Sequence, residues 1–459
     1  MPLKCVKKIT QFFVLLAGFA ILIQSPLAQV TIESRTDAKA NRERGLEMLE
    51  EIKDALKSRY YDKKFRGIDL DEKFTIAAER IKKLDANWQI FRVIAQVVLE
   101  LNDSHTRFYP PSRANRVEYG FSLQMIGDYC LVVDVKKGSD AEAKGLKVGD
   151  FVTQIAKYNP TRESLWKINY LLYWLDPLEE LSLFVLNPDK TEREIKIKSS
   201  FKSIKEREQE AKERRKQKAE SPYRCQEINS ETIACKLKTF STEKRLIDKM
   251  MKEEVGEHKK LILDLRGNGG GYVRIEEYLT GYFFQDDTKI ATFIMRNDKK
   301  ERIAKSQKKD AYKGELIVLI DSTSASASEV FSRVIQLEKR GKIVGDVSRG
   351  AVMTSILLRM ATTRGTRSMN TASIYALSLT IGDLIMSDGN RLENVGVIPD
   401  YPVGPGPNAL ARKADPVLAY SAELFGAKLS ADEAGKFYFI TEKPEDEDDT
   451  NDDDDGAEN

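Results

Sequence analysis

The chain has 459 residues, of which 41% are hydrophobic and 32% are charged, which is enough for about three domains with cores of ordinary size. Its net charge of +2 is unevenly spread, because residues 442–459 carry eleven acidic residues and one Lys, a charge of −10, which leaves +12 on the rest. The four Cys and two His have no spacing typical of a metal site, and no nucleotide-binding motif occurs, so neither a metal nor a cofactor is expected.

The first 28 residues have the layout of a secretory signal peptide. Three Lys among the first eight residues precede an apolar run from Phe12 to Ile23, and small residues suited to cleavage follow up to Ala28. This run is too short to span a bilayer comfortably. We therefore expect residues 1–28 to be a signal peptide and the protein to be exported, either to a periplasm or into the medium. An uncleaved membrane anchor is the alternative.

Residues 37–115 are expected to form a helical N-terminal domain, because Leu49, Ile52 and Leu56 recur at helical spacing. The region ends in the motif Asp103-Ser104-His105-Thr106. Taken alone, a single His is more often a structural or surface residue than a catalytic one. The second histidine, His258, lies in a charged segment before a predicted strand.

Residues 116–200 form a different unit, in which an alternating strand at 130–135 is followed by a Gly-rich turn, a short helical segment and further strands. This pattern resembles a PDZ domain. The resemblance implies that a loop and strand bind the C-terminal carboxylate of a peptide, which would add a strand to the sheet. The residues expected to do so are Tyr119, Gly120, Phe121, Ser122 and Leu123. A PDZ-like unit that only spaces or gates a neighbouring domain is the alternative.

Residues 201–222 are dominated by Lys, Arg, Glu and Gln and predict an exposed helical linker. Acidic residues are interleaved with the basic ones, so the segment is not expected to bind nucleic acid. Just beyond it, Cys225 and Cys235 flank a predicted hairpin. They either form a cross-hairpin disulfide, since an exported protein meets oxidising conditions, or remain free, and a disulfide there would leave Cys130 unpaired.

Two strand–turn–helix units lie within residues 223–425, the expected α/β core. The first strand, 260–266, runs into the Gly-rich turn 267–271, and the second, 317–320, runs through a turn of Ser and Ala into a helix that starts near Glu329. The N-terminus of a helix offers unpaired N–H groups and positive potential, which stabilise negative charge. The second turn is therefore the candidate site of a nucleophilic serine, and the first a candidate source of oxyanion donors.

Four segments in this region resemble peptidase family S41, which includes the C-terminal processing peptidases and the tricorn protease. The segments are Asp264-Leu265-Arg266-Gly267-Asn268-Gly269-Gly270-Gly271, Ser324-Ala325-Ser326-Ala327-Ser328-Glu329, Gly345-Asp346-Val347-Ser348-Arg349-Gly350 and Asn394-Val395-Gly396-Val397-Ile398-Pro399-Asp400. The resemblance implies a multi-domain α/β fold: a helical N-terminal region, a PDZ-like β-rich domain and a catalytic core of the ClpP/crotonase-like spiral type.

One departure from the family pattern changes the expected mechanism. The processing peptidases use a Ser–Lys pair, with the Lys 25 residues after the nucleophile, but counting from Ser326 leads to Ala351. Ala cannot act as a base. The tricorn-type branch instead uses Ser, His, a second Ser and Glu, and Ser104, His105 and Glu393 occupy matching positions.

The resemblance thus implies that Ser326 is the nucleophile and His105 the base, with Ser104 and Glu393 orienting the histidine. Backbone N–H groups of Gly269 or Gly270 and of Ala327 would form the oxyanion hole. We expect an exported serine peptidase that acts on proteins or peptides, some recognised through their C-terminal carboxylates. The alternatives are a catalytically inactive PDZ scaffold, which Ala351 favours, and an esterase that uses the same serine. The acidic tail 442–459 is expected to be a solvated, disordered segment, or else a partner-binding one.

Overall fold

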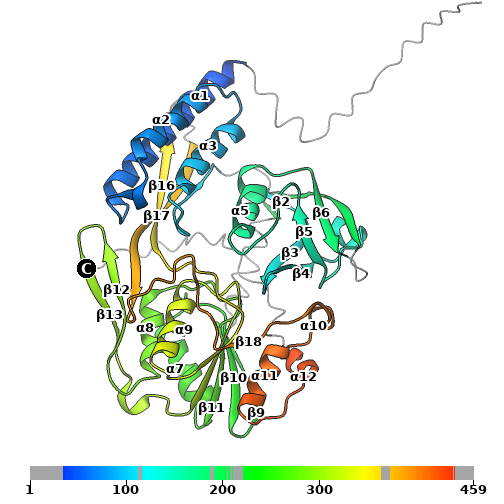
Figure 1. Cartoon of the computed structure of the whole chain (residues 1–459), viewed down its shortest axis with the longest axis vertical. Coiled ribbons are helices and arrows are strands. Elements are labelled where there is room, and N and C mark those ends of the chain that lie inside the picture. The colour runs from blue at the N-terminus through cyan, green and yellow to red at the C-terminus, as the bar shows by residue number, and fades with distance from the viewer. Residues whose placement is uncertain are drawn as a thin grey trace, which may run out of the picture.

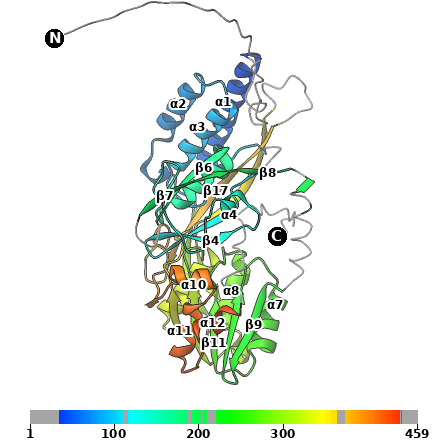
Figure 2. The same cartoon turned by 90° about the vertical axis from the view of Figure 1, so that its right-hand side faces the viewer.

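A computed structural model describes residues 35–111, 116–186, 191–203, 205–206, 209, 221–362, 373–437 and 439. The predicted signal peptide, most of the linker 201–222 and the acidic tail lie outside the described residues. Figures 1 and 2 show three parts along the long axis: helices α1–α3 at one end, a β-rich middle unit, and an α/β core at the other end. Among the described residues, no helix has the length and apolar character needed to cross a membrane.

The N-terminal part consists of helices α1 (Arg35–Arg59), α2 (Leu70–Ile81) and α3 (Asn87–Leu99), with a short 3-10 turn at Phe65–Gly67. Asp69 caps α2 by accepting a hydrogen bond from the Glu72 N–H at 3.0 Å. The apolar stripes of the helices form one buried cluster, which extends onto a sheet and includes Phe108, Tyr375 and Leu377. The predicted helical domain therefore packs on strands from elsewhere in the chain.

The sheet that packs against these helices combines strands that are far apart in the sequence. Strand β1 (Arg107–Tyr109) pairs antiparallel with β17 (Ser373–Met386), which also pairs with β16 (Thr354–Thr362) and β12 (Thr288–Met295), and β13 (Lys299–Ala304) forms the far edge. The β16–β17 hairpin rises from the core to reach α1 and α3 (Figure 1). A hairpin from the expected core region is thus part of the N-terminal unit, and holds the His105 segment close to the core.

The middle unit contains a five-stranded antiparallel sheet in the order β3-β4-β5-β6-β7. Its elements are β3 (Phe121–Ile126), β4 (Tyr129–Val135), β5 (Phe151–Ile155), β6 (Glu180–Leu186), β7 (Glu192–Lys198) and the helices α4 (Asp140–Ala143), α5 (Leu165–Tyr170) and the π-helical Leu171–Leu175. A two-stranded pair, β2 (Arg116–Glu118) with β8 (Ser200–Lys202), closes the unit. Strand β3, which follows the expected carboxylate-binding loop, is an edge strand of the five-stranded sheet.

The core is a six-stranded sheet in the order β18-β15-β14-β11-β10-β9, in which every pairing except β9–β10 is parallel. The strands are β9 (Tyr223–Asn229), β10 (Thr232–Leu237), β11 (Lys260–Asp264), β14 (Glu315–Ile320), β15 (Lys342–Gly345) and β18 (Tyr401–Pro402). Helices α7 (Lys244–Lys249), continued by a π-helix at Met250–Val255, α8 (Val273–Gly281) and α9 (Ala327–Leu337) belong to one side. Helices α11 (Pro416–Leu424) and α12 (Ala431–Gly435) cover the other, and α10 (Pro407–Arg412) precedes them.

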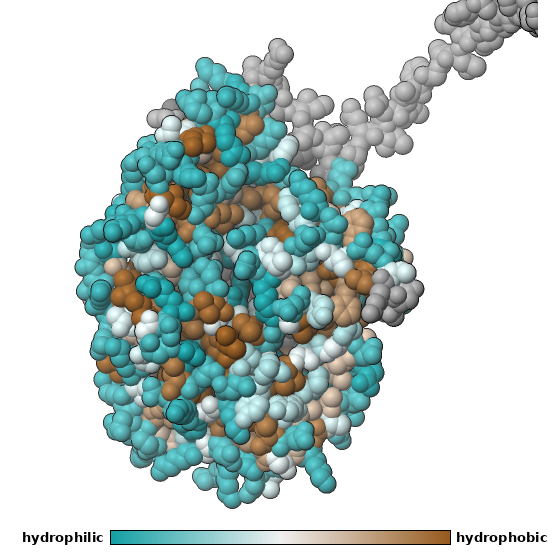
Figure 3. Space-filling view, viewed as in Figure 1, coloured by the Kyte–Doolittle hydropathy of each residue, from teal (hydrophilic) through white to brown (hydrophobic). Residues whose placement is uncertain are grey.

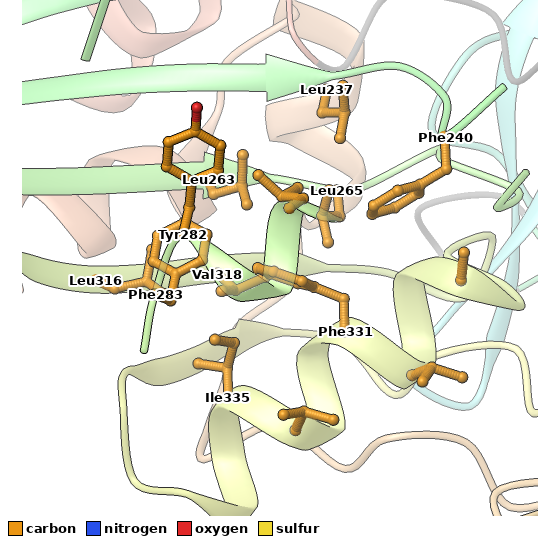
Figure 4. Close-up of a cluster of buried hydrophobic side chains, with 14 of the residues drawn as sticks. Leu237, Phe240, Leu263, Leu265, Tyr282, Phe283, Leu316, Val318, Phe331 and Ile335 are labelled. Atoms are coloured by element: carbon orange, nitrogen blue, oxygen red, sulfur yellow. The ribbon is translucent and has the colours of Figure 1, made fainter. Parts of the chain in front are cut away.

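Because helices cover both faces, the central strands are apolar throughout and do not alternate. On one face Leu263 and Val318 pack against Phe331 of α9 (Figure 4). On the other, Ile262 and Ile317 pack in a second buried cluster with α11. On the face shown in Figure 3, hydrophilic residues predominate and hydrophobic residues are scattered among them. The multi-domain α/β architecture predicted from the sequence is confirmed.

Two of the three cysteines beyond the signal segment form a disulfide. Cys225 and Cys235 face one another in the β9–β10 pair and are bonded. Cys130 is a buried free cysteine, and burial raises the pKa of its thiol to about 12. The disulfide that the hairpin spacing allowed is therefore present.

A buried ion cluster connects the core sheet to helix α11. Arg266 donates to both carboxylate oxygens of Asp264 and of Asp415, including 2.6 Å to Asp264 and 2.7 Å to Asp415. All three side chains are almost completely buried, and Asp415 also caps α11 at the Leu418 N–H. The cluster fixes the start of the Gly-rich turn, which begins at Gly267.

We expect Arg266→Met to lower the free energy of unfolding by about 3–5 kcal/mol, because two buried carboxylates would lose the guanidinium they share, and only Asp264 would keep a cation nearby, Lys236 at 4.0 Å. Arg412→Met is the matched control: Arg412 pairs with Asp432 on the surface, where both side chains are 63% exposed. That change should cost less than about 1 kcal/mol. Chemical denaturation measures both, and similar small losses would show that the buried cluster does not stabilise the core.

Candidate active site

The turn between β14 and α9 is held by one carboxylate. Asp321 Oδ1 accepts the N–H groups of Thr323 and Ser324, both at 3.0 Å, and that of Gly267 in the Gly-rich turn at 3.1 Å. A single side chain therefore shapes the serine turn and attaches it to the Gly-rich turn.

Ser326 is the residue that precedes the first turn of α9, with φ 53° and ψ −117°. A positive φ is uncommon for a residue with a side chain and is often found at functional sites. The Ser326 N–H is directed at the Ala351 carbonyl, 2.8 Å away, and at Glu329 Oε2, 3.1 Å away. The strained backbone is therefore held in place from two directions.

The structure distinguishes Ser326 from the two serines beside it. Ser324 and Ser328 are completely buried, and their hydroxyls donate to backbone carbonyls, Leu265 O at 2.8 Å and Asn268 O at 2.9 Å. Ser326 is only half-buried and lines a pocket. Of these three serines, only Ser326, the one chosen from the sequence, lines the pocket.

Glu329 supports this turn from inside the core. Its carboxylate is completely buried and accepts the Gly350 N–H at 2.6 Å, the Ala351 N–H at 2.8 Å and the Ser348 hydroxyl at 2.6 Å, besides the Ser326 N–H. Burial raises the pKa of Glu329, and these donors oppose the rise. Glu329 thereby fixes the position of Ser326 relative to the 348–351 segment.

The Gly-rich turn approaches Ser326 so closely that a side chain is excluded. At Gly270, with φ 107°, a Cβ atom would lie 2.7 Å from the Ser326 Cβ. The Gly270 N–H is donated to Asn268 Oδ1 at 2.9 Å, whereas Gly269 lines the pocket beside Ser326. Of the two glycines considered from the sequence, only Gly269 lines the pocket, and the Gly270 N–H is already bonded. Ala327 supplies the first N–H of α9.

The histidine motif is anchored by Asp103, which is 4% exposed. Asp103 Oδ1 accepts the N–H groups of His105 at 2.9 Å and Thr106 at 2.6 Å, and the Thr380 hydroxyl of β17 at 2.9 Å. Asp103 Oδ2 accepts the Tyr60 hydroxyl at 2.7 Å. These bonds attach the turn that carries His105 to both the helices and the sheet of the N-terminal unit.

Three side chains form a hydrogen-bonded row. The Ser104 hydroxyl lies 2.7 Å from His105 Nδ1 and donates to Glu393 Oε2 at 2.9 Å, and the Ser104 N–H donates to Glu393 Oε1 at 2.7 Å. When the hydroxyl donates to Glu393, its oxygen accepts the proton of His105 Nδ1, which leaves a lone pair on Nε2. Burial raises the pKa of Glu393 to about 7, opposed by hydrogen bonds from Ser104 and the Val352 N–H.

One pocket of about 200 Å³ brings these groups together. Ser104 and His105 from the N-terminal unit, Gly269 and Ser326 from the core, and Ala351 all line it. Ala351 thus occupies the wall beside Ser326, where the sequence spacing placed it, and offers no base. A larger open groove, between α1 and β16, contains none of these side chains.

Comparison with known proteins matches this region to one family. Residues 233–403, which include Ser326 and Glu393, match the model of Peptidase family S41. The chain carries an S41 peptidase domain.

Two curated relatives extend the match. The chloroplastic carboxyl-terminal-processing peptidase 1 of Arabidopsis thaliana is 22% identical over 338 residues, covering 67% of this chain and 61% of the relative. The tail-specific protease of Haemophilus influenzae is 31% identical over 156 residues, which is 33% of this chain and 21% of that protein. The chain therefore spans less than two thirds of the length of these relatives.

Among solved structures, mature CPAF superposes with a TM-score of 0.62 at 14% sequence identity, covering 87% of this chain and 98% of CPAF. A complex of mature CPAF with lactacystin gives 0.61 at 13% identity. At such low identity the likeness concerns the fold, and it includes the N-terminal and middle units as well as the S41 domain.

The five residues predicted to capture a carboxylate lie outside the pocket. Tyr119 is buried, with its hydroxyl bonded to Leu178, and Phe121, Ser122 and Leu123 begin the edge strand β3. The far end of β3 contacts the serine turn of the S41 domain. Gln124 donates to Asp321 Oδ2 at 3.0 Å, and the Ser322 hydroxyl donates to the Met125 carbonyl.

Sequence reasoning missed two supporting carboxylates, Asp103 and Glu329. Glu329 had a local signal, since a Glu three residues after a Ser at a helix start is the pattern of a capping box. Asp103 precedes the Ser-His pair, but its partners Tyr60 and Thr380 are distant in sequence. Two arginines of the pocket wall, Arg107 and Arg349, were also unexpected as site residues.

Proposed function

We propose that this protein is an exported serine peptidase that hydrolyses proteins or peptides by a Ser–His mechanism. The observation that carries the proposal is the shared pocket, in which Ser326 of the S41 domain and His105 of the N-terminal unit line the same small cavity. The relatives named as a C-terminal-processing peptidase and a tail-specific protease support peptide substrates.

The geometry suits acyl transfer. Ser326 Oγ attacks the substrate carbonyl while His105 Nε2 takes its proton, and His105 then returns the proton to the leaving amine. The Ser104 hydroxyl and the Glu393 carboxylate hold the proton on Nδ1 and stabilise the charged imidazole. The N–H groups of Gly269 and Ala327 would stabilise the oxyanion, and loss of one such donor typically costs about 10²–10³ in kcat.

The middle unit offers a route for substrate recognition. A peptide that adds to the edge of β3, with its carboxylate at the Tyr119–Gly120 turn, would run toward the end of the strand that contacts the serine turn. This arrangement supports capture of C-terminal segments by a PDZ-like unit. The disulfide between Cys225 and Cys235 supports export, because such bonds persist mainly in oxidising compartments.

Ala351 favours the second candidate, an inactive peptide-binding scaffold. It lines the pocket next to Ser326, where a Ser–Lys peptidase would place its base. The two candidates differ in whether Ser326 is nucleophilic.

A fluorophosphonate probe, which reacts with activated serines, tests this difference. We expect the full chain to be labelled, and Ser326→Ala and His105→Ala to abolish labelling. Ser328→Ala is the matched control, because that hydroxyl is buried and bonded to a carbonyl, and it should leave labelling intact. A folded protein that stays unlabelled would support the scaffold instead.

A further inference from the structure

Helix α1 and strand β16 lie beside one another at the end of the molecule that is remote from the core (Figure 1). An open groove of about 780 Å³ runs between them. It is lined by residues from the C-terminal end of α1, Ala55 and Ser58 among them, and by four consecutive residues of β16, 357–360. The groove is larger than the catalytic pocket, which measures about 200 Å³.

The strand side of the groove is apolar and accessible. Leu357 is 37% exposed, and Leu358 and Met360 are half-buried, since they pack only in part against the buried cluster of the N-terminal unit. An apolar side chain bound in the groove would cover surface that water now contacts, which favours binding. An open apolar groove on a folded protein often marks an interaction site.

The helix side of the groove is held in place by hydrogen bonds. The Lys57 carbonyl, near the end of α1, accepts the Arg296 guanidinium at 2.6 Å. The Lys57 ammonium group donates to Asp71 of α2 at 2.6 Å, and the Ser58 hydroxyl donates to the Asp54 carbonyl at 2.7 Å. These two side chains are satisfied within the chain, so they require no polar partner from a molecule in the groove.

The groove is continuous with the catalytic pocket along β16. Ser355 lines the pocket, and Leu357, two residues further along the strand, lines the groove. Leu357 also stands opposite Ser378 of β17, a second residue of the pocket lining. At about 3.3 Å per residue, the groove begins about 7 Å from Ser355 and extends about 10 Å further. A chain extended along β16 would therefore leave the pocket and enter the groove within a few of its own residues.

Building on the proposed peptidase function, we propose that this groove binds an apolar side chain of the polypeptide substrate, on one side of the scissile bond and a few residues from it. The catalytic pocket holds only a small part of an extended substrate, so the rest of the chain crosses the neighbouring surface. The groove offers that surface along β16. Such a site selects substrates with a residue such as Leu, Met or Phe at one position, separately from any capture of a C-terminus by the middle unit.

The test begins with cleavage of a randomised peptide library by the full chain. The products should show an apolar residue enriched at one position, about two to six residues from the cut. Matched peptides with Leu or Ser at that position, all with amidated C-termini, are then bound to the Ser326→Ala protein and followed by fluorescence anisotropy. Full burial of an apolar side chain corresponds to about 10–100-fold in affinity, and an open groove buries part of it, so the Leu peptide should bind at least about fivefold more tightly.

Substitutions in the Ser326→Ala background assign the effect to the groove. Leu357→Ser removes the exposed apolar wall and should reduce the Leu-to-Ser ratio to within about twofold, whereas Leu357→Met should retain most of it. Ser58→Trp, which places a large ring in the groove from the α1 side, should reduce the ratio as well. Ile76→Ser is the matched control, because Ile76 is 50% exposed on α2 and outside the groove lining, and the ratio should not change.

Cleavage without an apolar preference near the cut, equal binding of the Leu and Ser peptides, or a ratio that survives both Leu357→Ser and Ser58→Trp would each overturn the proposal. If Leu357→Ser dissociates a dimer of the full chain, measured by sedimentation, the groove belongs to a contact with a second copy of this chain and the proposal is wrong. Failure of the peptidase function appears separately, as a wild-type protein that neither cleaves the library nor reacts with the fluorophosphonate probe.

Discussion

Replacing Ser326 or His105 by Ala should each lower kcat/KM for a cleaved peptide by at least about 10⁴-fold, and replacing both should cost little more than the larger single change. Groups that act as one unit in acyl transfer are strongly non-additive, because removing either leaves only binding and oxyanion stabilisation. The two residues belong to different parts of the chain but line one pocket. The measurement is steady-state hydrolysis by the two single variants and the double variant.

His258→Ala is the control for the histidine. His258 is the only other histidine in the chain, and its ring is bonded to the Val255 carbonyl outside the pocket. The His258→Ala change should leave kcat/KM unchanged. If His105→Ala kept activity near that of the wild type, or if the losses of the two single variants multiplied in the double variant, the Ser–His pairing would be wrong.

The sequence predicted well the features that depend on local pattern. Apolar runs such as Ile317–Ile320 are long enough and β-branched enough to be buried strands, and the Gly and Ser-Ala turns that follow them mark strand–turn–helix units. The parallel core sheet follows from that alternation. The spacing from Ser326 to Ala351 was also informative, since both residues line the pocket.

Features that depend on pairing between distant segments could not be predicted in the same way. From the sequence, strands β16 and β17 are expected to belong to the core. In the structure, Leu377 of β17 instead pairs with Phe108 of β1, and both side chains are buried against the N-terminal helices. Nothing local in either segment specifies this partner. The resemblance pointed to His105, and the shared sheet is the physical reason that the turn carrying His105 lies at the same pocket as Ser326.

The same limit applies to polar groups whose partners come from several elements. The Asp103 carboxylate accepts hydrogen bonds from Tyr60, which directly follows α1, from an N–H group of its own turn, and from Thr380 of β17. Such a carboxylate is visible in a sequence only as one Asp among many. Its burial shows that the position of the histidine turn is set by tertiary hydrogen bonds.

Glu393→Gln is expected to lower kcat by about 10²–10⁴-fold with a small effect on KM. The NH₂ group of Gln would donate to the Ser104 hydroxyl oxygen, so the hydroxyl proton would be donated to His105 Nδ1. The ring proton of His105 would then be on Nε2, the nitrogen that has to accept the proton of Ser326. An Asp-to-Asn change behind a catalytic His acts in this way in serine proteases. Kinetics at saturating and limiting substrate separate kcat from KM.

The pH dependence of the wild type tests the same network. Burial raises the pKa of Glu393 to about 7 from its ordinary value of 4.5, so the carboxylate that accepts the Ser104 proton forms only as the pH passes 7. Activity should therefore rise between about pH 6 and 8. Glu276→Gln is the control, because Glu276 is another buried carboxyl with a raised pKa but lies on α8, outside the pocket lining, and the rise should persist in that variant.

The contribution of Glu393 to the free energy of unfolding should fall over the pH range in which activity rises. A carboxyl whose pKa is higher in the folded than in the unfolded state favours folding fully below pH 4.5, and this contribution is lost as the pH rises through 7. Relative to the wild type, Glu393→Gln should thus gain up to about 3 kcal/mol of unfolding free energy between pH 4.5 and 8, measured by denaturation at each pH. A difference that stays constant across this range would contradict the raised pKa. If Glu393→Gln is more stable than the wild type above pH 7 but inactive there, the ionised Glu393 carboxylate is retained for its effect on His105 and not for stability.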